Sequence, residues 1–164
     1  MNEVTDLTKR EMVEIDQGIK VVRAQTVNTN QGPISTSKGF TLPFKLMYTN
    51  TYNEQKMAPH MKAFQEGSKA LMEKCKTKKK GDEDVVDMEK FNKEIEKLLD
   101  EKVEDLVLRP IYASQIDEML NDEYYKKVNK EAGLQEYVSL MFKLIIDDIT
   151  ENGEDTSETK KPEK

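Results

Sequence analysis

Residues 43–76, PFKLMYTNTYNEQKMAPHMKAFQEGSKALMEKCK, decide the fold of this chain. Pro43 suits the first position of a helix, because its missing amide hydrogen would be unpaired there in any case. Phe44, Tyr48 and Tyr52 then form one apolar stripe at helical spacing. A second stripe, slightly out of phase, consists of Met57, Met61, Phe64, Leu71 and Cys75, with Ser68 filling its line. The pattern predicts one long amphipathic helix.

Pro59 lies where the two stripes change phase. A proline inside a helix removes one hydrogen bond and clashes with the preceding turn, so we expect a kink near residues 56–58. After a charged turn, Asp87 suits the N-cap of a second helix. The apolar face of that helix consists of Met88, Phe91, Ile95, Leu98 and Leu99. Two such helices fold back on each other, which predicts an antiparallel helical hairpin over residues 44–102, kinked at Pro59.

The N-terminal part of the chain predicts a further helix. Thr8 and Glu11 have the spacing of a capping box, in which each side chain binds a free amide at the helix start. Apolar residues follow at helical steps as far as Val22, although the branched residues in 19–27 also allow a strand there. Residues 28–39, rich in glycine and short polar side chains, indicate a loop or a ragged hairpin.

Two elements are expected after the hairpin. Residues 103–112 are rich in branched side chains and lead into Arg109-Pro110, which favours a short strand or an extended connector. Ser114 and Asp117 then resemble another helix start, for a helix that runs past Tyr124 and Tyr125 to Val128. The fold class is therefore mainly α, with the hairpin packed against N- and C-terminal helices and a small β or extended element near residues 103–112.

The C-terminal region contains the most apolar stretch of the chain. Gly133 punctuates before it, and residues 134–149 have the periodicity of a helix. This helix is more apolar around its circumference than one packing face requires, so it is either a central core helix or a protein interface. The predicted interface residues are Tyr137, Leu140, Met141, Phe142, Leu144, Ile145 and Ile146. Residues 1–150 therefore form one mainly helical domain, and the polar residues 151–164 form a disordered tail.

The composition limits the classes of function. The chain has 164 residues, of which 35% are charged, and its formal net charge is -6. Its only dense basic run lies within residues 74–80 and is followed at once by Asp82, Glu83 and Asp84. This pattern indicates a solvated turn and no nucleic-acid partner. The first twenty residues contain no apolar core of a signal peptide, and no run is long enough to span a membrane. We therefore expect neither secretion nor a membrane partner.

Candidates for catalysis and for metal binding are few. His60 is the only histidine and Cys75 the only cysteine, and about 22 Å of helix separates them at 1.5 Å per residue. Carboxylate pairs such as Asp147-Asp148, or Glu94 with Glu101, lack the glycine geometry of a calcium loop and indicate a solvated helix face. Neither common phosphate-binding glycine motif occurs. We expect no enzyme activity, no cofactor, no metal and no small-molecule substrate.

The hairpin resembles a family of small uncharacterised helical proteins encoded by tailed bacteriophages and prophages. The resemblance covers residues 42–112. It rests on Leu42 to Leu46, on Phe64 to Leu71, and on Phe91 to Leu99 with Val103 and Glu104 after them. It implies a phage origin and a role in virion assembly or in handling host proteins, and it carries over no catalytic residue.

The leading hypothesis is a non-enzymatic phage structural or accessory protein that makes protein contacts in virion assembly. Its partner would be itself or another virion protein, in the host cytoplasm or in the virion. The alternative is a phage-encoded inhibitor that binds and blocks a host protein. A third class, a small enzyme, would need a site built from carboxylates and tyrosines such as Tyr112, Tyr124 and Tyr125.

Overall fold

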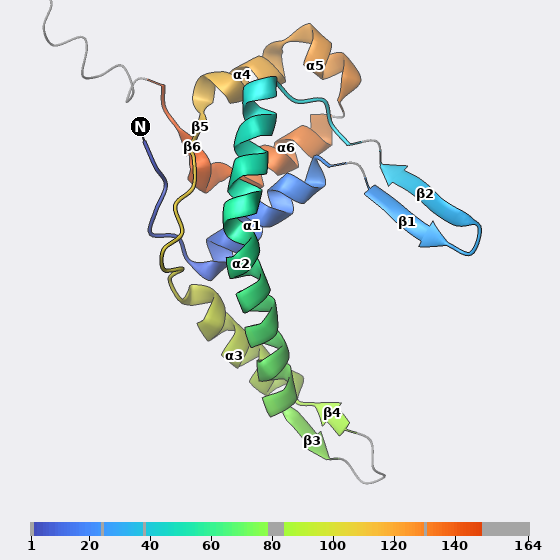
Figure 1. Cartoon of the computed structure of the whole chain (residues 1–164), viewed down its shortest axis with the longest axis vertical. Coiled ribbons are helices and arrows are strands. Elements are labelled where there is room, and N and C mark those ends of the chain that lie inside the picture. The colour runs from blue at the N-terminus through green and yellow to red at the C-terminus, as the bar shows by residue number, and fades with distance from the viewer. Residues whose placement is uncertain (1, 24, 38, 79–83, 130, 149–164) are drawn as a thin grey trace, which may run out of the picture.

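The computed structural model describes residues 2–23, 25–37, 39–78, 84–129 and 131–148 (Figure 1). Its helices are α1 (Lys9–Val21), α2 (Phe44–Lys74), α3 (Met88–Asp100), α4 (Ala113–Asn121), α5 (Glu123–Val128), α6 (Glu131–Leu140) and the 3-10 turn η1 (Phe142–Leu144). Its strands are β1 (Gln25–Thr29), β2 (Gly32–Ser37), β3 (Lys76–Lys78), β4 (Asp84–Val86), β5 (Ile111–Tyr112) and β6 (Ile145–Ile146). The strands form three separate pairs. The predicted mainly helical class with small β elements is confirmed.

The helix starts predicted at Thr8 and Asp87 are confirmed at the level of single hydrogen bonds, whereas the start predicted at Ser114 lies inside α4, whose N-cap is Tyr112. The Thr8 hydroxyl accepts from the amide of Glu11 at 3.2 Å, and the Glu11 carboxylate accepts from the amide of Thr8 at 2.9 Å. The Asp87 carboxylate accepts from the amide of Lys90 at 3.2 Å and so caps α3. Both caps satisfy amides that a helix start would otherwise leave unpaired.

Helix α2 runs from Phe44 to Lys74 and continues unbroken through Pro59. The stripe predicted for its first half is wrong. Phe44 is 80% exposed and Tyr48 is 54% exposed. The buried stripe consists instead of Leu46, Thr49, Asn50, Asn53 and Met57. These positions also recur at steps of three and four residues. The first half of α2 therefore has two faces that fit a helical pattern, and the face with the asparagines, not the aromatic one, packs against the core.

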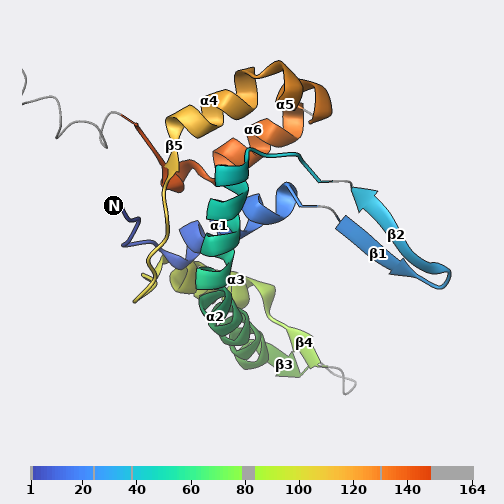
Figure 2. The ribbon, with the colours of Figure 1, turned by 45° about the horizontal axis from the view of Figure 1, so that its top comes forward.

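The upper part of the molecule, here called the body, contains α1, the first half of α2, α4 to α6, and the parallel pair β5–β6 (Figure 2). Helices α1 and α6 pack closely because Gly18 has no side chain. A Cβ atom at Gly18 would lie 2.7 Å from Met141 Sδ. The large side chains that are fully buried here are Tyr137, Met12, Ile15, Leu46, Met57, Leu108, Ile111, Met119, Met141 and Leu144.

The lower part, here called the arm, comprises the described residues of 60–100. Helix α3 folds back along the second half of α2, as predicted, and the antiparallel pair β3–β4 joins their ends (Figure 1). This strand pair takes part of the region predicted as a charged turn, whose residues 79–83 lie outside the described part. Among the described arm residues only Cys75 is fully buried, and none of α3 is.

Two buried asparagines hold extended segments by imitating a strand. The Asn53 side chain accepts from the Arg109 amide at 2.8 Å and donates to the Arg109 carbonyl at 2.9 Å. Asn129 binds the main chain of Thr41 in the same two-way manner, with both hydrogen bonds at 2.8 Å. A buried backbone amide and carbonyl need partners, and each side chain supplies both. These contacts fix the connector before β5 and the segment before α2.

Three C-terminal predictions need correction. The helix expected to run to Val128 breaks at Asp122, whose carboxylate caps α5 by accepting from the Tyr124 amide at 2.8 Å. Gly133 lies inside α6, where a Cβ atom would come within 2.1 Å of Phe40 Cζ. The helix expected over residues 134–149 ends at Leu140. The 3-10 turn η1 and then strand β6 follow instead, because β5 offers Ile145 and the next residue a parallel partner.

The region between α1 and α2 is the antiparallel hairpin β1–β2, which was one of the two predicted forms of residues 28–39. It extends away from the helices in both views (Figures 1 and 2). The connector after α3 forms two isolated bridges with the N-terminal segment, Val4 with Leu108 and Thr8 with Lys102. The predicted disordered tail, residues 151–164, lies outside the described residues.

Candidate protein-binding surface

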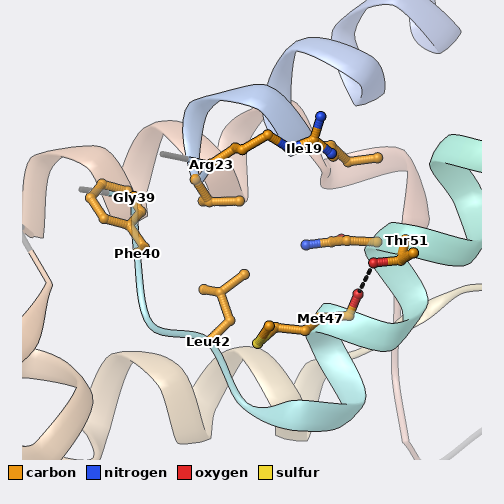
Figure 3. Close-up of a pocket in the computed structure, with 9 residues that line it drawn as sticks. Ile19, Arg23, Gly39, Phe40, Leu42, Met47 and Thr51 are labelled. Carbon is orange, nitrogen blue, oxygen red and sulfur yellow. Dashed lines mark hydrogen bonds between the residues drawn. The ribbon is translucent and has the colours of Figure 1, made fainter. Parts of the chain in front are cut away.

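A cleft lies at the base of the β1–β2 hairpin, between the end of α1, the segment before α2 and the first turns of α2 (Figure 3). Its volume is about 240 Å³. Figure 3 shows Ile19 and Arg23 on the α1 side, Leu42 on the segment and Met47 on α2. The residues that line it are Ile19, Val22, Arg23, Gly39, Phe40, Leu42, Met47, Asn50 and Thr51. Apolar side chains thus form most of its wall.

Asn50 gives this apolar wall a polar group. It is only 5% exposed, and its Oδ1 accepts from the hydroxyl of Tyr137 at 2.9 Å. Burial raises the pKa of Tyr137, and the hydrogen bond to Asn50 opposes that rise. Tyr137 therefore keeps its proton at neutral pH and donates it, which fixes the orientation of the Asn50 amide.

The charged groups at the cleft are paired. Arg23 forms an ion pair with Glu54, which lies on α2 one turn beyond the cleft. The Thr51 hydroxyl donates to the Met47 carbonyl at 3.0 Å, a bond drawn in Figure 3. Apolar side chains therefore make up the larger part of the cleft wall, beside the polar side chains of Asn50, Thr51 and the ion-paired Arg23.

Exposed apolar side chains continue from the cleft along α2. Phe44, Met47 and Tyr48 are 80%, 51% and 54% exposed, and we call these three residues the α2 patch. Met47 belongs to both the patch and the cleft. The guanidinium of Arg109 lies 5.3 Å from the Tyr48 ring and 3.9 Å from the Tyr52 ring, which holds this edge of the patch in place. Aromatic side chains and methionine of this kind are enriched in protein-binding surfaces.

The interface residues predicted from the sequence divide into three groups. Tyr137, Met141 and Leu144 are fully buried in the body, where a partner cannot reach them. Leu140, Ile145 and Ile146 are half-buried. Phe142 alone among the seven is strongly exposed, at 72%. The most apolar stretch of the chain thus supplies core side chains first, and its one exposed ring lies at the η1 turn.

The candidate catalytic residues do not come together. Cys75 is buried at the end of α2, whereas His60 lines a different cleft with Phe64 and Leu98. Asp148 accepts from the Ser114 amide at 2.8 Å and from the Ser114 hydroxyl, and these bonds lower the pKa of its carboxyl. Within the described ranges, no three His, Cys, Asp or Glu side chains are arranged to hold a metal ion.

Comparisons of this chain with protein-family models, with characterised proteins and with solved structures found no match. In the part of the chain that the structure describes, no helix has both the length and the apolar character of a membrane crossing.

Sequence reasoning missed the cleft and the α2 patch. The available signal was the spacing of Leu46, Asn50, Asn53 and Met57, which places two asparagines on one face with two apolar residues. The prediction instead placed the aromatic stripe of Phe44, Tyr48 and Tyr52 on the apolar face of the helix. The aromatic face of a helix is the one that is buried when the opposite face is less apolar and its polar side chains find no hydrogen-bond partners in the core.

Proposed function

We propose that this chain is a non-enzymatic phage structural or accessory protein that binds other proteins during virion assembly. The observation that carries the binding part is the exposed α2 patch, which continues into an apolar cleft. The phage part is supported by the resemblance of residues 42–112 to helical proteins of tailed phages and prophages. The partner is a second copy of the chain or another virion protein.

The surface is expected to act through the exposed ring of Phe44. Phe44 exposes four-fifths of its side chain at the start of α2, beside Met47. Aromatic side chains and methionine are enriched in protein interfaces, where they supply large apolar area. Burial of this area against a partner stabilises the complex, whereas an acidic group at the same position would have to be desolvated.

Two matched substitutions test which surface binds. The variant Phe44→Asp is expected to weaken the complex at least tenfold, because a buried interface anchor contributes roughly 2 kcal/mol or more. Phe142→Asp places the same charge on the exposed ring of the interface predicted from the sequence, and it is expected to leave binding unchanged. Isothermal titration, or light scattering after size-exclusion chromatography for self-association, measures both. A complex lost with Phe142→Asp and kept with Phe44→Asp would contradict the proposed surface.

The biological setting is tested separately. Mass spectrometry of purified particles is expected to find the chain in the virion, or cross-linking is expected to find it bound to a virion protein during assembly. A strict monomer that is absent from particles and from assembly intermediates would overturn the virion role. If affinity capture from host lysate instead retains one host protein in stoichiometric amount, the chain is an inhibitor that blocks that protein.

A further inference from the structure

We infer that the cleft binds one large apolar side chain of a partner polypeptide, and that Asn50 Nδ2 donates a hydrogen bond to the main-chain carbonyl beside that side chain. This inference rests on the proposed function and names the feature of the partner that the cleft takes. Two physical properties of the cleft carry it, namely its size and the unpaired Nδ2 donor of the buried Asn50.

The size of the cleft suits a single side chain. At about 240 Å³ it lies below the range of about 300–1,000 Å³ that is usual for sites of drug-sized ligands. Its walls are formed by the aliphatic ends of Ile19, Val22 and Leu42, with Met47 at the mouth. A flexible thioether at the mouth adapts to side chains of different shape. The walls therefore select for apolar character.

The free donor follows from the hydrogen bonds of Asn50. Its Oδ1 is occupied by Tyr137, which does not line the cleft. Its Nδ2 has no hydrogen-bond partner among the described residues. Every fully enclosed side-chain nitrogen or oxygen in that part of the chain does have a partner, so Nδ2 is not fully enclosed. Nδ2 therefore reaches the open space of the cleft. Asn50 is 95% buried, and its unpaired Nδ2 can form a hydrogen bond with an acceptor atom of the ligand.

The charges decide what kind of acceptor fits. Among the described residues, Arg23 is the only cationic side chain that lines the cleft, and it forms an ion pair with Glu54. Lys20, next to Ile19 on α1, is paired with Asp16 at 2.6 Å. A carboxylate on the ligand would have to break one of these ion pairs or remain uncompensated. A neutral carbonyl, such as the one on every residue of a polypeptide, fits without that cost.

The surroundings favour a polypeptide over a free small molecule. The α2 patch begins at the mouth of the cleft, where Met47 is shared, and continues to Phe44 and Tyr48. A polypeptide that places one side chain in the cleft can cover this patch with its neighbouring residues. The arrangement is typical of interfaces in which one apolar anchor fills a pocket and further contacts surround it.

The first experiment uses two probes on the isolated full chain. N-acetyl-L-phenylalanine amide carries the ring and the carbonyl, and toluene carries the ring alone. Methyl NMR signals of Ile19, Val22, Leu42 and Met47 report occupation of the cleft. We expect both probes to shift these signals, with the amide binding more tightly. Absence of shifts at saturating probe, or tighter binding of toluene, would overturn the inference.

The donor is tested with a double variant that removes both partners of the Asn50 hydrogen bond. Asn50→Leu with Tyr137→Phe leaves no polar group unpaired, so the fold is expected to tolerate it. We expect the affinity for the amide probe to fall about threefold to tenfold, as for loss of one hydrogen bond, and that for toluene to change less than twofold. Tyr137→Phe alone keeps the donor and serves as the control. Equal affinity of the double variant and the control for the amide would overturn the role of Asn50.

A third variant keeps the inference testable even if the double variant does not fold. Thr51→Trp places a large ring at the exposed edge of the cleft and is expected to abolish binding of both probes. Gln65→Trp adds the same ring about 21 Å further along α2 and is expected to leave binding unchanged. Retained binding in Thr51→Trp would exclude the cleft as the site. These measurements need no partner, so their failure is distinguishable from failure of the proposed virion role.

Discussion

The two halves of α2 differ in what they contribute, although one unbroken helix contains both. Before Pro59, five residues of the helix are buried in the body, whereas between Pro59 and the end of the helix none is. In the second half, Phe64 and Leu71 are half-buried, and Phe64 packs against the edge of the body core. A Cβ atom added at Gly67 would lie 3.7 Å from a methyl group of Leu98 on α3. A helix can therefore be stabilised by fully buried residues at one end and by half-buried contacts at the other.

This difference indicates that the body contributes more to the free energy of unfolding than the arm does. Helix α3 has a strongly amphipathic sequence and packs against α2 and α1, but none of its residues is fully buried and its apolar face is half exposed. Regions with few buried apolar contacts open at a lower free energy than the core does. The arm is thus expected to open while the body stays folded, and the following substitutions test this difference from the largest expected effect to the smallest.

The largest effect compares two isoleucines. Ile15 is fully buried in the body, and Ile15→Ala is expected to lower the free energy of unfolding by about 2–5 kcal/mol. Ile95 in the arm is half-buried, and Ile95→Ala is expected to cost about 1 kcal/mol, because less apolar surface is lost. Urea unfolding followed by circular dichroism measures both. Equal losses would show that the arm is as well packed as the body.

The next effect concerns the asparagine that holds the Arg109 main chain. Asn53→Ala is expected to lower the free energy of unfolding by about 2–3 kcal/mol, since the partly buried amide and carbonyl of Arg109 both lose their partner. Asn92→Ala on the exposed side of α3 is the control and is expected to change it by less than about 0.5 kcal/mol. A loss below 1 kcal/mol for Asn53→Ala would mean that water replaces the side chain at Arg109.

Two glycine substitutions are expected to have opposite signs. Gly133→Ala forces a methyl group against the Phe40 ring and is expected to lower the free energy of unfolding by about 1–3 kcal/mol. Gly67→Ala lies in the interior of α2 with room for a methyl group, and is expected to raise it by about 0.5–1 kcal/mol. Thermal unfolding monitored by calorimetry distinguishes the two. A destabilising Gly67→Ala would indicate that the arm packs more tightly than described.

The smallest effect is a pH dependence at the C-terminal end of the body. Hydrogen bonds from Ser114 lower the pKa of Asp148 in the folded chain below its unfolded value. The Asp148 contribution to stability is therefore present above the ordinary pKa of aspartate and is lost as pH falls through the folded value. Ser114→Ala is expected to raise the Asp148 pKa in an NMR titration and to reduce the acid sensitivity of unfolding. An unchanged pKa would place the cause outside the Ser114 side chain.

The sequence could predict the elements whose signals are local. The caps at Thr8 and Asp87 act within one helical turn, so residue types at fixed spacing are sufficient to identify them. The hairpin of α2 and α3 follows from two apolar stripes joined by a short polar segment. The end of α6 could not be predicted in this way. Ile145 and Ile146 continue a helical pattern, and only their pairing with β5, more than thirty residues earlier in the chain, makes them a strand.

The candidate binding site could not be predicted from the sequence for a related reason. Asn50 and Asn53 face the interior because each finds a partner from a distant part of the chain, Tyr137 and the Arg109 main chain. Without those partners, the aromatic face of Phe44 would be the better choice for burial. Which face a helix buries thus depends on polar partners that periodicity does not reveal.

The close packing of α1 against α6 at Gly18 also governs the order in which the chain can assemble. Helix α1 leaves the ribosome long before α6, which begins only at residue 131. Contacts between such distant segments form late, because the loop-closure entropy must be overcome before they stabilise anything. The arm, whose two helices are neighbours in the sequence, can pack first. During synthesis the surface of α1 around Gly18 therefore remains accessible to chaperones and proteases until α6 arrives.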